Sequence, residues 1–248
     1  MVIQHVWRTW PLILAYHSVS PHRSDGLAVK PSEFDKQMAW LKARGYRSVT
    51  LGQYAIGTFK KGERILIITF DDGYADNYTE AFPILHRYGF LCTIFLVTDY
   101  INTDRIFPWD EKKVQGPDDR SFYRALTWDE IRTMADAGME FGSHTCTHPE
   151  LAHVSLDVCR EEVMRSRAHL SERLGHDVMS FCYPRGSLND AVMQTVQEAG
   201  YTAAVVTPPR ADIPLTPYTL RRSGIYYKDH FWRFRLKTNP LLKRWHYG

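Results

Sequence analysis

The sequence predicts an α/β protein, a single irregular (β/α)7-type barrel with its active site at the C-terminal ends of the strands. Short apolar runs alternate with capped amphipathic segments along the 248 residues, which is the pattern of a parallel sheet with helices outside it. Polar clusters follow directly on several predicted strands. No predicted strand is followed by the glycine-rich turn of a dinucleotide-binding open sheet. Because closure removes the exposed sheet edges, a barrel is favoured over the open doubly wound sheet, which stays the alternative.

The predicted strands are short runs that favour extended structure, several of them rich in Ile, Val, Phe and Tyr. Each run is bounded by residues typical of turns or helix starts. In chain order the predicted strands cover 11–16, 46–49, 64–70, 92–97, 139–143, 178–183 and 201–207, with a short eighth at 218–222.

Five helices are expected between these strands, from start signals and from glycines at their ends. Thr127 and Glu130 form a capping box for one of them. The longest is expected to place Val158, Val163 and Leu170 on its inner side. The expected ranges are 31–45, 78–88, 127–138, 155–175 and 189–200.

Residues 101–126 interrupt the alternation of strands and helices. This segment is rich in Pro, Gly, Asp and aromatic residues, and it is too long for an ordinary connection. It is therefore predicted to be a lid or substrate loop, with a disordered insertion as the alternative. We assign residues 1–228 to a catalytic domain that includes this insertion, and 229–248 to a basic, aromatic C-terminal segment.

The composition excludes several classes of protein. Hydrophobic residues make up 44% and charged residues 24% of the chain, as in globular proteins, and a net charge of +3 is too balanced for a nucleic-acid-binding protein. No apolar run approaches the ~18 residues of a membrane span. The N-terminal segment, interrupted by Arg8 and Pro11, lacks the cleavage site of a secretory signal, and the four cysteines are scattered. We therefore expect a cytoplasmic protein with reduced thiols.

The C-terminal residues 231–248, FWRFRLKTNPLLKRWHYG, interleave aromatic residues with Lys and Arg. This pattern suits peripheral contact with the inner face of a membrane, where aromatic rings lie at headgroup depth and cations face anionic lipid. In the alternative, the segment closes the barrel with its aromatic stems buried and its charges in water. Pro240 argues against one continuous amphipathic helix.

The candidate catalytic residues gather at four predicted strand ends. Asp71 and Asp72 are adjacent carboxylates that repel each other unless a cation or a proton relieves one of them. His144 and His148 are four residues apart, so both imidazoles can face one ion, with an Asp completing a site of two histidines and one carboxylate. Structural histidines without a metal are the alternative for an isolated pair. The four strand ends are YHS at 16–18, FDDG at 70–73, SHTCTH at 143–148 and YPRG at 183–186.

Three of these segments, ITFDDGYADN, GSHTCTH and FCYPRG, resemble the first three motifs of the polysaccharide deacetylase family, also called the NodB-homology or carbohydrate esterase family 4 group. The resemblance spans residues 11–225. The early LAYHSV segment is similar to the N-terminal histidine motif of the branch that deacetylates exopolysaccharide poly-N-acetylglucosamine. The resemblance implies removal of N-acetyl groups from N-acetylhexosamine units of a polysaccharide or lipid-linked saccharide, with release of acetate.

The resemblance also implies a role for each matching residue. Asp72, His144 and His148 would hold one divalent metal, most often Zn²⁺, although Co²⁺ and Ni²⁺ also accept these ligands. Asp71 would be the general base, because a carboxylate beside a metal ligand can take a proton from water whose pKa the cation lowers. His17 would protonate the departing amine.

Two further residues match the third motif, and one position departs from it. The backbone N–H of Arg185 would help to hold the oxyanion, and Tyr183 would line the pocket. Cys182 stands where many relatives carry an arginine that orients the base. Arg222, in LRRSGI, is the candidate replacement, whereas its neighbour Arg221 is equally well explained as a surface arginine.

Three other functions are weighed against the deacetylase. A related amidohydrolase acting on a small non-sugar amide would use the same residues. A non-haem Fe(II) oxygenase also uses two histidines and one carboxylate, but Asp71 is suited to act as a base and not as a fourth ligand. A non-catalytic sugar-binding module is disfavoured because Asp71, Asp72, His144 and His148 are all present. Cys146, between the two histidines, is expected to face away from the metal.

Overall fold

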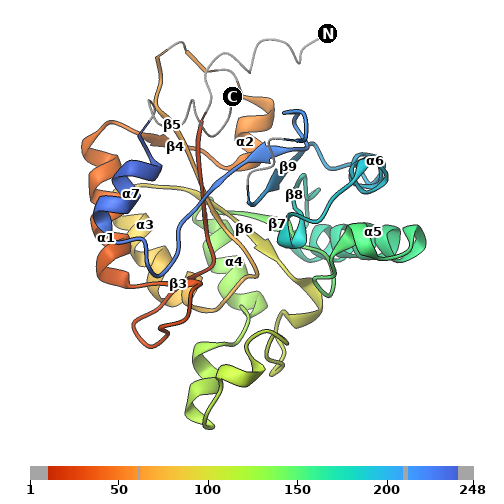
Figure 1. Cartoon of the computed structure of the whole chain (residues 1–248), viewed down its shortest axis with the longest axis horizontal. Coiled ribbons are helices and arrows are strands. Elements are labelled where there is room, and N and C mark those ends of the chain that lie inside the picture. The colour runs from red at the N-terminus through yellow and green to blue at the C-terminus, as the bar shows by residue number, and fades with distance from the viewer. Residues whose placement is uncertain (1–10, 58, 61, 209–211, 240–248) are drawn as a thin grey trace.

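The computed structural model describes residues 11–57, 59–60, 62–208 and 212–239, and in it parallel strands form a barrel with helices outside (Figure 1). The neighbouring strands pair in the order β10-β9-β8-β7-β6-β5-β1-β11, and each of these pairs is parallel. Their bounds are β1 Leu12–Tyr16, β5 Ile65–Phe70, β6 Cys92–Leu96, β7 Glu140–Ser143, β8 Ser180–Cys182, β9 Ala203–Val206, β10 Leu220–Arg221 and β11 Ser223–Gly224.

The short segment 220–224 closes the barrel. Its first half, β10, pairs with β9, and its second half, β11, pairs with β1. Arg222 lies between the two halves, and its backbone N–H donates to the carbonyl of Val206. Because one segment bridges both edges of the sheet, neither edge is left open there. The predicted α/β barrel is confirmed.

Three strands lie beside this path. β4 (Arg47–Ser48) pairs with the start of β5. β2 (Ser18–Val19) and β3 (Ala28–Val29) form a separate parallel pair directly after β1, which the sequence did not predict. Two-residue strands carry too few residues for an alternation of apolar and polar positions to show.

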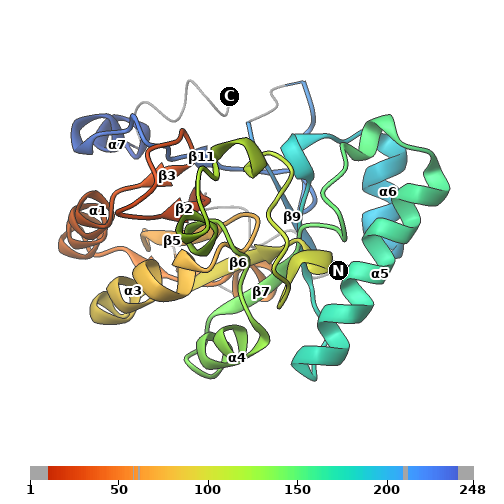
Figure 2. The same cartoon turned by 90° about the horizontal axis from the view of Figure 1, so that it is seen from below.

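The helices surround the strands (Figure 2). They are α1 Pro31–Ala43, α2 Leu51–Ile56, α3 Phe82–Tyr88, α4 Trp128–Asp136, α5 Leu156–Leu174, α6 Asp190–Glu198 and α7 Phe231–Lys237. The capping box of Thr127 and Glu130 is present at the start of α4. The helices α2 and α7 were not predicted, although Thr50 and Gln53 form a second capping box at the start of α2.

Two details of the predicted helices are wrong. The segment expected to be one helix at 78–88 is a π-helical turn, Asn77–Ala81, followed by α3. Pro83 lies in the first turn of α3, directly after the π-helical turn, and has no N–H to donate to that turn. Val158 is 43% exposed because the buried face of α5 runs through its neighbour Cys159 and not through Val158, whereas Val163 and Leu170 are buried as expected.

Alternation along the strands separates two apolar layers. On β1 and β5, the side chains of Leu14 and Ile68 belong to the large core that also includes buried residues of the outer helices, while those of Ile13 and Ile67 belong to a smaller cluster. The smaller cluster also contains inward residues of β6, β8, β9 and β10, so it fills the barrel interior. Thr69 continues the inward series on β5. By the same alternation, the side chain of Asp71, which directly follows β5, points into the barrel.

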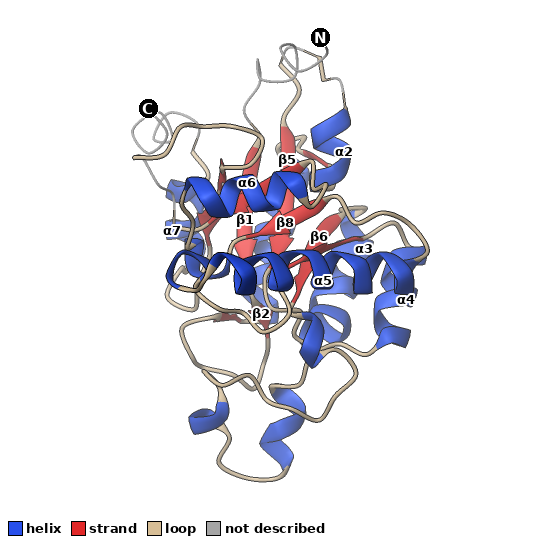
Figure 3. Ribbon diagram, turned by 90° about the vertical axis from the view of Figure 1, so that its right-hand side faces the viewer, coloured by secondary structure: helices blue, strands red, loops and turns tan. Residues whose placement is uncertain are grey.

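The insertion at 101–126 is folded and packs at the end of the barrel away from α2 (Figure 3). It contains short 3₁₀ turns at Glu111–Lys113 and Asp118–Phe122. Its Phe107 packs with Tyr74 and Tyr100 in a third apolar cluster, and Ala125 forms a bridge with Tyr74. A disordered insertion, the alternative left open by the sequence, is therefore wrong. Within the described residues, no helix has the length and apolar character needed to cross a membrane.

Candidate active site

The four predicted strand ends meet at one cavity of about 390 Å³ at the carboxyl end of the barrel. Every residue that the sequence analysis assigned to the site lines this cavity, and Trp109 and Tyr226 join them. The assigned residues are His17, Asp71, Asp72, His144, His148, Tyr183, Arg185 and Arg222. Their roles are predictions that this shared placement supports.

The side chains of Asp72, His144 and His148 face one another. Asp72 Oδ1 lies 3.6 Å from His144 Nε2 and 3.7 Å from His148 Nε2, and the three candidate ligand atoms lie within 4.8 Å of one another. Burial, followed by the neighbouring charge of Asp71, raises the pKa of Asp72 well above its usual range. A divalent cation would relieve that charge, so the donors present fit a metal.

The backbone explains how adjacent carboxylates reach different partners. Asp72 has φ of 71°, in the left-handed region, and Gly73 follows with φ of 78°. This sharp turn directs Asp71 towards Arg222 and Asp72 towards the two histidines. His148 also has a left-handed φ, of 68°. Non-glycine residues in this conformation are uncommon and cluster at functional sites.

The two histidines are oriented differently. The Nδ1 atom of His144 lies 2.8 Å from the backbone carbonyl of Cys182, which leaves its Nε2 facing Asp72. Burial lowers the pKa of His144 to about 4, so the ring is neutral near pH 7 and able to ligate. The Nδ1 atom of His148 is buried and has no hydrogen-bond partner among the described residues. Its ring instead packs on Trp109, with ring centroids 4.5 Å apart.

Glu162 on α5 holds the loop between the histidines, and the sequence analysis did not identify it. Its carboxylate accepts hydrogen bonds from the backbone N–H groups of Cys146 at 2.8 Å and Thr147 at 2.9 Å, and from the Thr147 hydroxyl at 2.6 Å. The thiol of Cys146 donates to the carbonyl of Glu162, so it faces α5 and not the metal cluster, as expected. No local signal distinguishes Glu162 from the other acidic residues of α5.

Asp71 is paired with Arg222. The guanidinium donates to both carboxylate oxygens, at 2.6 and 2.7 Å, and also to Thr69 at 2.8 Å. Burial alone would raise the pKa of Asp71, but the charge of Arg222 outweighs burial and holds this pKa well below its usual range. Asp71 is therefore ionised, as a general base must be.

The departure at Cys182 has a structural counterpart. The Cys182 thiol lies 3.6 Å from Asp71 Oδ1, and Arg222 Nη2 donates to the same sulfur at 3.1 Å. Arg222 thus reaches the Asp71 carboxylate from the segment 220–224 that closes the barrel. This supports the assignment of Arg222 as the replacement for the motif arginine that is missing at Cys182. Its neighbour Arg221 is buried and donates to the carbonyl of Ile213, so the surface interpretation of Arg221 is wrong.

The remaining assigned residues surround Asp71 on the cavity side. His17 Nε2 lies 3.9 Å from Asp71 Oδ2, and burial lowers the pKa of His17. The buried hydroxyl of Tyr183 has no hydrogen-bond partner among the described residues. Arg185 has φ of 54°, and its backbone N–H meets no acceptor in the described part of the chain. An unpaired N–H at the cavity is what an oxyanion requires.

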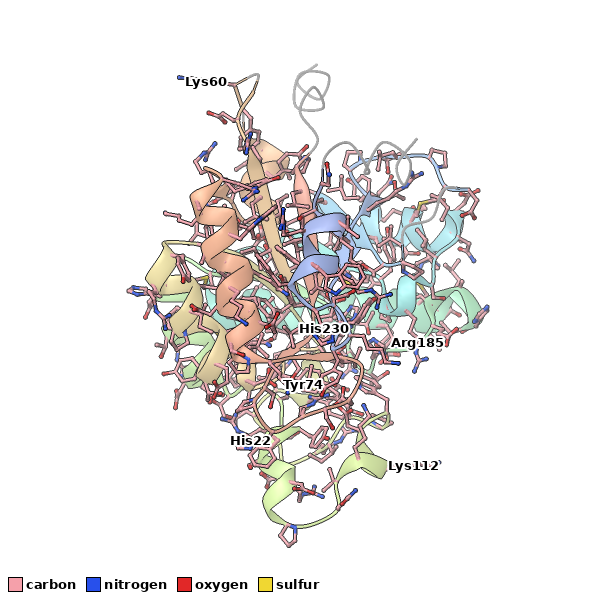
Figure 4. The ribbon with its side chains drawn as sticks, turned by 60° about the vertical axis from the view of Figure 1, so that its left-hand side comes forward. His22, Lys60, Tyr74, Lys112, Arg185 and His230 are labelled. Carbon is pink, nitrogen blue, oxygen red and sulfur yellow. The ribbon has the colours of Figure 1, made fainter. Side chains whose placement is uncertain are left out.

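The insertion supplies part of the cavity wall, through Trp109 and Lys113, and these residues were not predicted from the sequence. The indole N–H of Trp109 donates to the hydroxyl oxygen of Tyr74 at 2.8 Å, and that hydroxyl donates to Asp110 at 2.5 Å. Lys113 donates to the same carboxylate at 2.6 Å. Figure 4 shows Lys112, in the insertion, at the opposite end of the molecule from Lys60, with Tyr74 and Arg185 between them.

A family model described as polysaccharide deacetylase matches residues 59–204, which is more than half of the chain and includes both candidate metal-ligand motifs. The chain belongs to the polysaccharide deacetylase family. The resemblance stated from the three motifs is thereby confirmed.

Two relatives within the polysaccharide deacetylase family illustrate how far the similarity extends. The chain is 30% identical over 202 residues to YxkH of Bacillus subtilis, whose own assignment as a polysaccharide deacetylase is provisional. It is also 30% identical over 150 residues to the poly-beta-1,6-N-acetyl-D-glucosamine N-deacetylase of Escherichia coli K12. These matches cover 80% and 55% of this chain, and 65% and 21% of the two relatives. The chain thus spans less than two thirds of either relative.

The chain has the same fold as a solved deacetylase structure. The Streptococcus pyogenes deacetylase PplD, in complex with acetate, superimposes with a TM-score of 0.75 at 25% identity. The match covers 94% of this chain and 99% of PplD. The similarity therefore extends over nearly the whole of both chains.

Proposed function

We propose that this protein is a metal-dependent de-N-acetylase that hydrolyses the acetamide of an N-acetylhexosamine unit, such as N-acetylglucosamine, and releases acetate. The observation that carries the proposal is that two adjacent carboxylates have different partners. Asp72 faces His144 and His148, whereas Asp71 forms a buried ion pair with Arg222. The names of the E. coli relative and of PplD support the reaction type and, for the former, a GlcNAc polymer as substrate. A saccharide carried on a lipid is an equally suitable substrate.

The chain's own residues account for each proton movement. A divalent metal held by Asp72, His144 and His148 would polarise the acetamide carbonyl and acidify water when bound. Asp71 is ionised and accepts the proton of the attacking water. The backbone N–H of Arg185 donates to the developing oxyanion. His17 lies beside Asp71, so it would take up the proton that Asp71 has accepted from water and deliver it to the departing amine as the C–N bond breaks.

The metal is proposed to be Zn²⁺, with Co²⁺ and Ni²⁺ as substitutes, because two imidazoles and one carboxylate suit all three ions. The same set is also found with Fe(II), which is why the metal content decides between a hydrolase and an oxygenase. Asp71 also forms a group with His144 and Cys182 whose candidate ligand atoms lie within 4.8 Å of one another. Arg222 already donates to both carboxylate oxygens of Asp71, however, which favours a base over a metal ligand and therefore favours the hydrolase.

Asp71→Asn tests the catalytic proposal. We expect one metal per chain to be retained and acetate release from N-acetylglucosamine oligomers to fall by ~10²- to 10⁴-fold, the usual contribution of a general base. An Asp71→Asn protein with normal activity contradicts the assignment. A wild-type protein that cleaves small amides but no N-acetylated saccharide favours the amidohydrolase alternative, and a metal-loaded protein with no hydrolase activity favours the sugar-binding module.

Contact with the inner face of a membrane, and a cytoplasmic location, stay predictions. Phe234 of α7 is buried against Trp40, whereas Trp232, which is 60% exposed, and Leu236 project beside Arg235 into a surface groove. Exposed Trp, Leu and Arg side chains suit a headgroup layer. Residues 240–248 lie outside the described residues. Sedimentation with anionic vesicles, comparing the wild type with Trp232→Ser, tests the membrane contact.

A further inference from the structure

A second cavity adjoins the catalytic cavity. The residues Leu27 and Tyr226 line both cavities, so the two cavities are direct neighbours. Tyr226 also faces His17, with ring centroids 6.3 Å apart. The other residues that line the second cavity are Ser24, Gly26, Tyr227, Lys228, Asp229, Arg233 and Lys237.

The second cavity carries an excess of positive charge. Its carboxylate, Asp229, is already satisfied, because it accepts from Lys237 Nζ at 2.5 Å and from the backbone N–H of Tyr226 at 2.9 Å. Lys228 and Arg233 have no carboxylate partner among the described residues. Arg233 Nη1 donates to the backbone carbonyl of Lys228 at 3.5 Å, and both residues line this cavity.

The cavity also offers surfaces that suit a sugar ring. Tyr226 and Tyr227 are half-buried, so each presents part of an aromatic ring. Lys237 Nζ lies 5.3 Å from the centroid of the Tyr226 ring, and this ammonium also donates to the carbonyl of Gly224, which fixes its position. Aromatic walls with a few convergent polar groups are typical of binding sites for small organic ligands.

We propose that this second cavity binds an anionic group of the substrate, a carboxylate or a phosphate, on the saccharide next to the unit that is deacetylated. Guanidinium and ammonium groups form their strongest hydrogen bonds with such anions. This placement of the saccharide, with the deacetylated unit at Asp72, His144 and His148 and the next unit beyond Tyr226 near Lys228 and Arg233, rests on the proposed function. The anion site itself does not depend on catalysis.

Binding to the Asp71→Asn protein tests this proposal without turnover. Three probes are compared by calorimetry: chitotetraose, which is neutral; a heparosan tetrasaccharide, which carries carboxylates; and chitotetraose 1-phosphate. In the Lys228→Ala/Arg233→Ala variant, we expect the ratio of the Kd of an anionic probe to that of chitotetraose to rise by about tenfold. Added salt should reduce the preference for the anionic probe.

The control is Lys36→Ala/Arg132→Ala, which removes the same charge from exposed positions on α1 and α4. A change confined to the heparosan probe identifies a carboxylate, and one confined to the phosphate probe identifies a phosphate. An unchanged ratio, or the same change in the control, overturns the proposal. Acetate release by the wild type is measured separately, so failure of the deacetylase proposal is distinguishable from failure of this one.

Discussion

The two candidate histidine ligands are held by different parts of the molecule. His144 directly follows β7, and the backbone carbonyl of Cys182 on β8 fixes its ring through Nδ1. His148 lies four residues later in a loop, and its Nδ1 has no hydrogen-bond partner among the described residues. Trp109, supplied by the insertion, packs on its ring instead. The barrel therefore orients one ligand and the insertion orients the other.

Through this contact, the insertion packs directly against the candidate metal site. Partners that orient a metal ligand commonly change metal affinity by ~10- to 100-fold when they are removed. Trp109 is in turn held by Tyr74, which directly follows the Asp71-Asp72-Gly73 turn. The insertion and the Asp71-Asp72-Gly73 turn are thus connected through the side chains of Trp109 and Tyr74.

Removal of the Asp72 carboxylate, which faces both histidines, has the largest expected effect. Asp72→Ala deletes the carboxylate that lies within 3.7 Å of both Nε2 atoms, so we expect the bound metal to fall from one per chain to none, and activity with it. Metal content of protein purified without chelator checks this. The fold is expected to persist, because the substitution also removes a buried charge that Asp71 repels. Retention of a full equivalent of metal contradicts the assignment.

Arg222→Gln tests the Asp71–Arg222 ion pair, which is built by the barrel without the insertion. Loss of one partner of a buried ion pair is expected to lower the free energy of unfolding by ~3–5 kcal/mol, measured by urea unfolding at pH 7. The pKa of Asp71 is depressed in the folded protein, so the pair stabilises the fold above the unfolded pKa near 3.8 and is lost as pH falls through the lower folded pKa.

Without Arg222, burial raises the pKa of Asp71, and the stabilisation above pH 3.8 disappears. The acid limb of the activity profile should accordingly move to higher pH in Arg222→Gln. An unchanged acid limb would falsify the pairing as the cause of the low pKa.

Trp109→Ala tests the half that the insertion builds. We expect the metal dissociation constant, measured by competition with a chelator, to rise by ~10- to 100-fold because His148 loses the ring that orients it. Cys182→Ala is the matched control on the other histidine. It removes a side chain but keeps the carbonyl that binds His144 Nδ1, so its metal affinity should stay close to that of the wild type. If Trp109→Ala and Cys182→Ala change the metal dissociation constant equally, the insertion does not orient His148 in a way that differs from the orientation of His144.

Tyr74→Phe gives the smallest expected effect and tests the link behind Trp109. The hydroxyl donates to Asp110 and accepts from Trp109, so its loss leaves buried polar groups without a partner. We expect a loss of ~1–3 kcal/mol in the free energy of unfolding. That loss corresponds to a fall in Tm of roughly 2–4 °C per kcal/mol. Differential scanning calorimetry measures it, and an unaltered Tm means that this hydrogen-bond chain does not stabilise the insertion.

The sequence determined the features that depend on near neighbours along the chain. Apolar runs, caps and terminal glycines located the barrel strands and most helices, because these signals act within a few residues. Asp71, Asp72, His144 and His148 were identified from short motifs, since a turn of fixed length already brings each pair to a strand end. Family resemblance added Arg222, which no local pattern connects to Asp71.

Only the tertiary structure decided which distant residues complete the site. Arg222 pairs with Asp71 across 151 positions of the chain, and Glu162 reaches back 16 positions to the loop between the histidines. The contact of Trp109 with His148 and the second cavity beside Tyr226 likewise depend on how elements pack against each other. Packing is a property of the closed barrel as a whole, so these partners leave no periodic or local signal in the sequence.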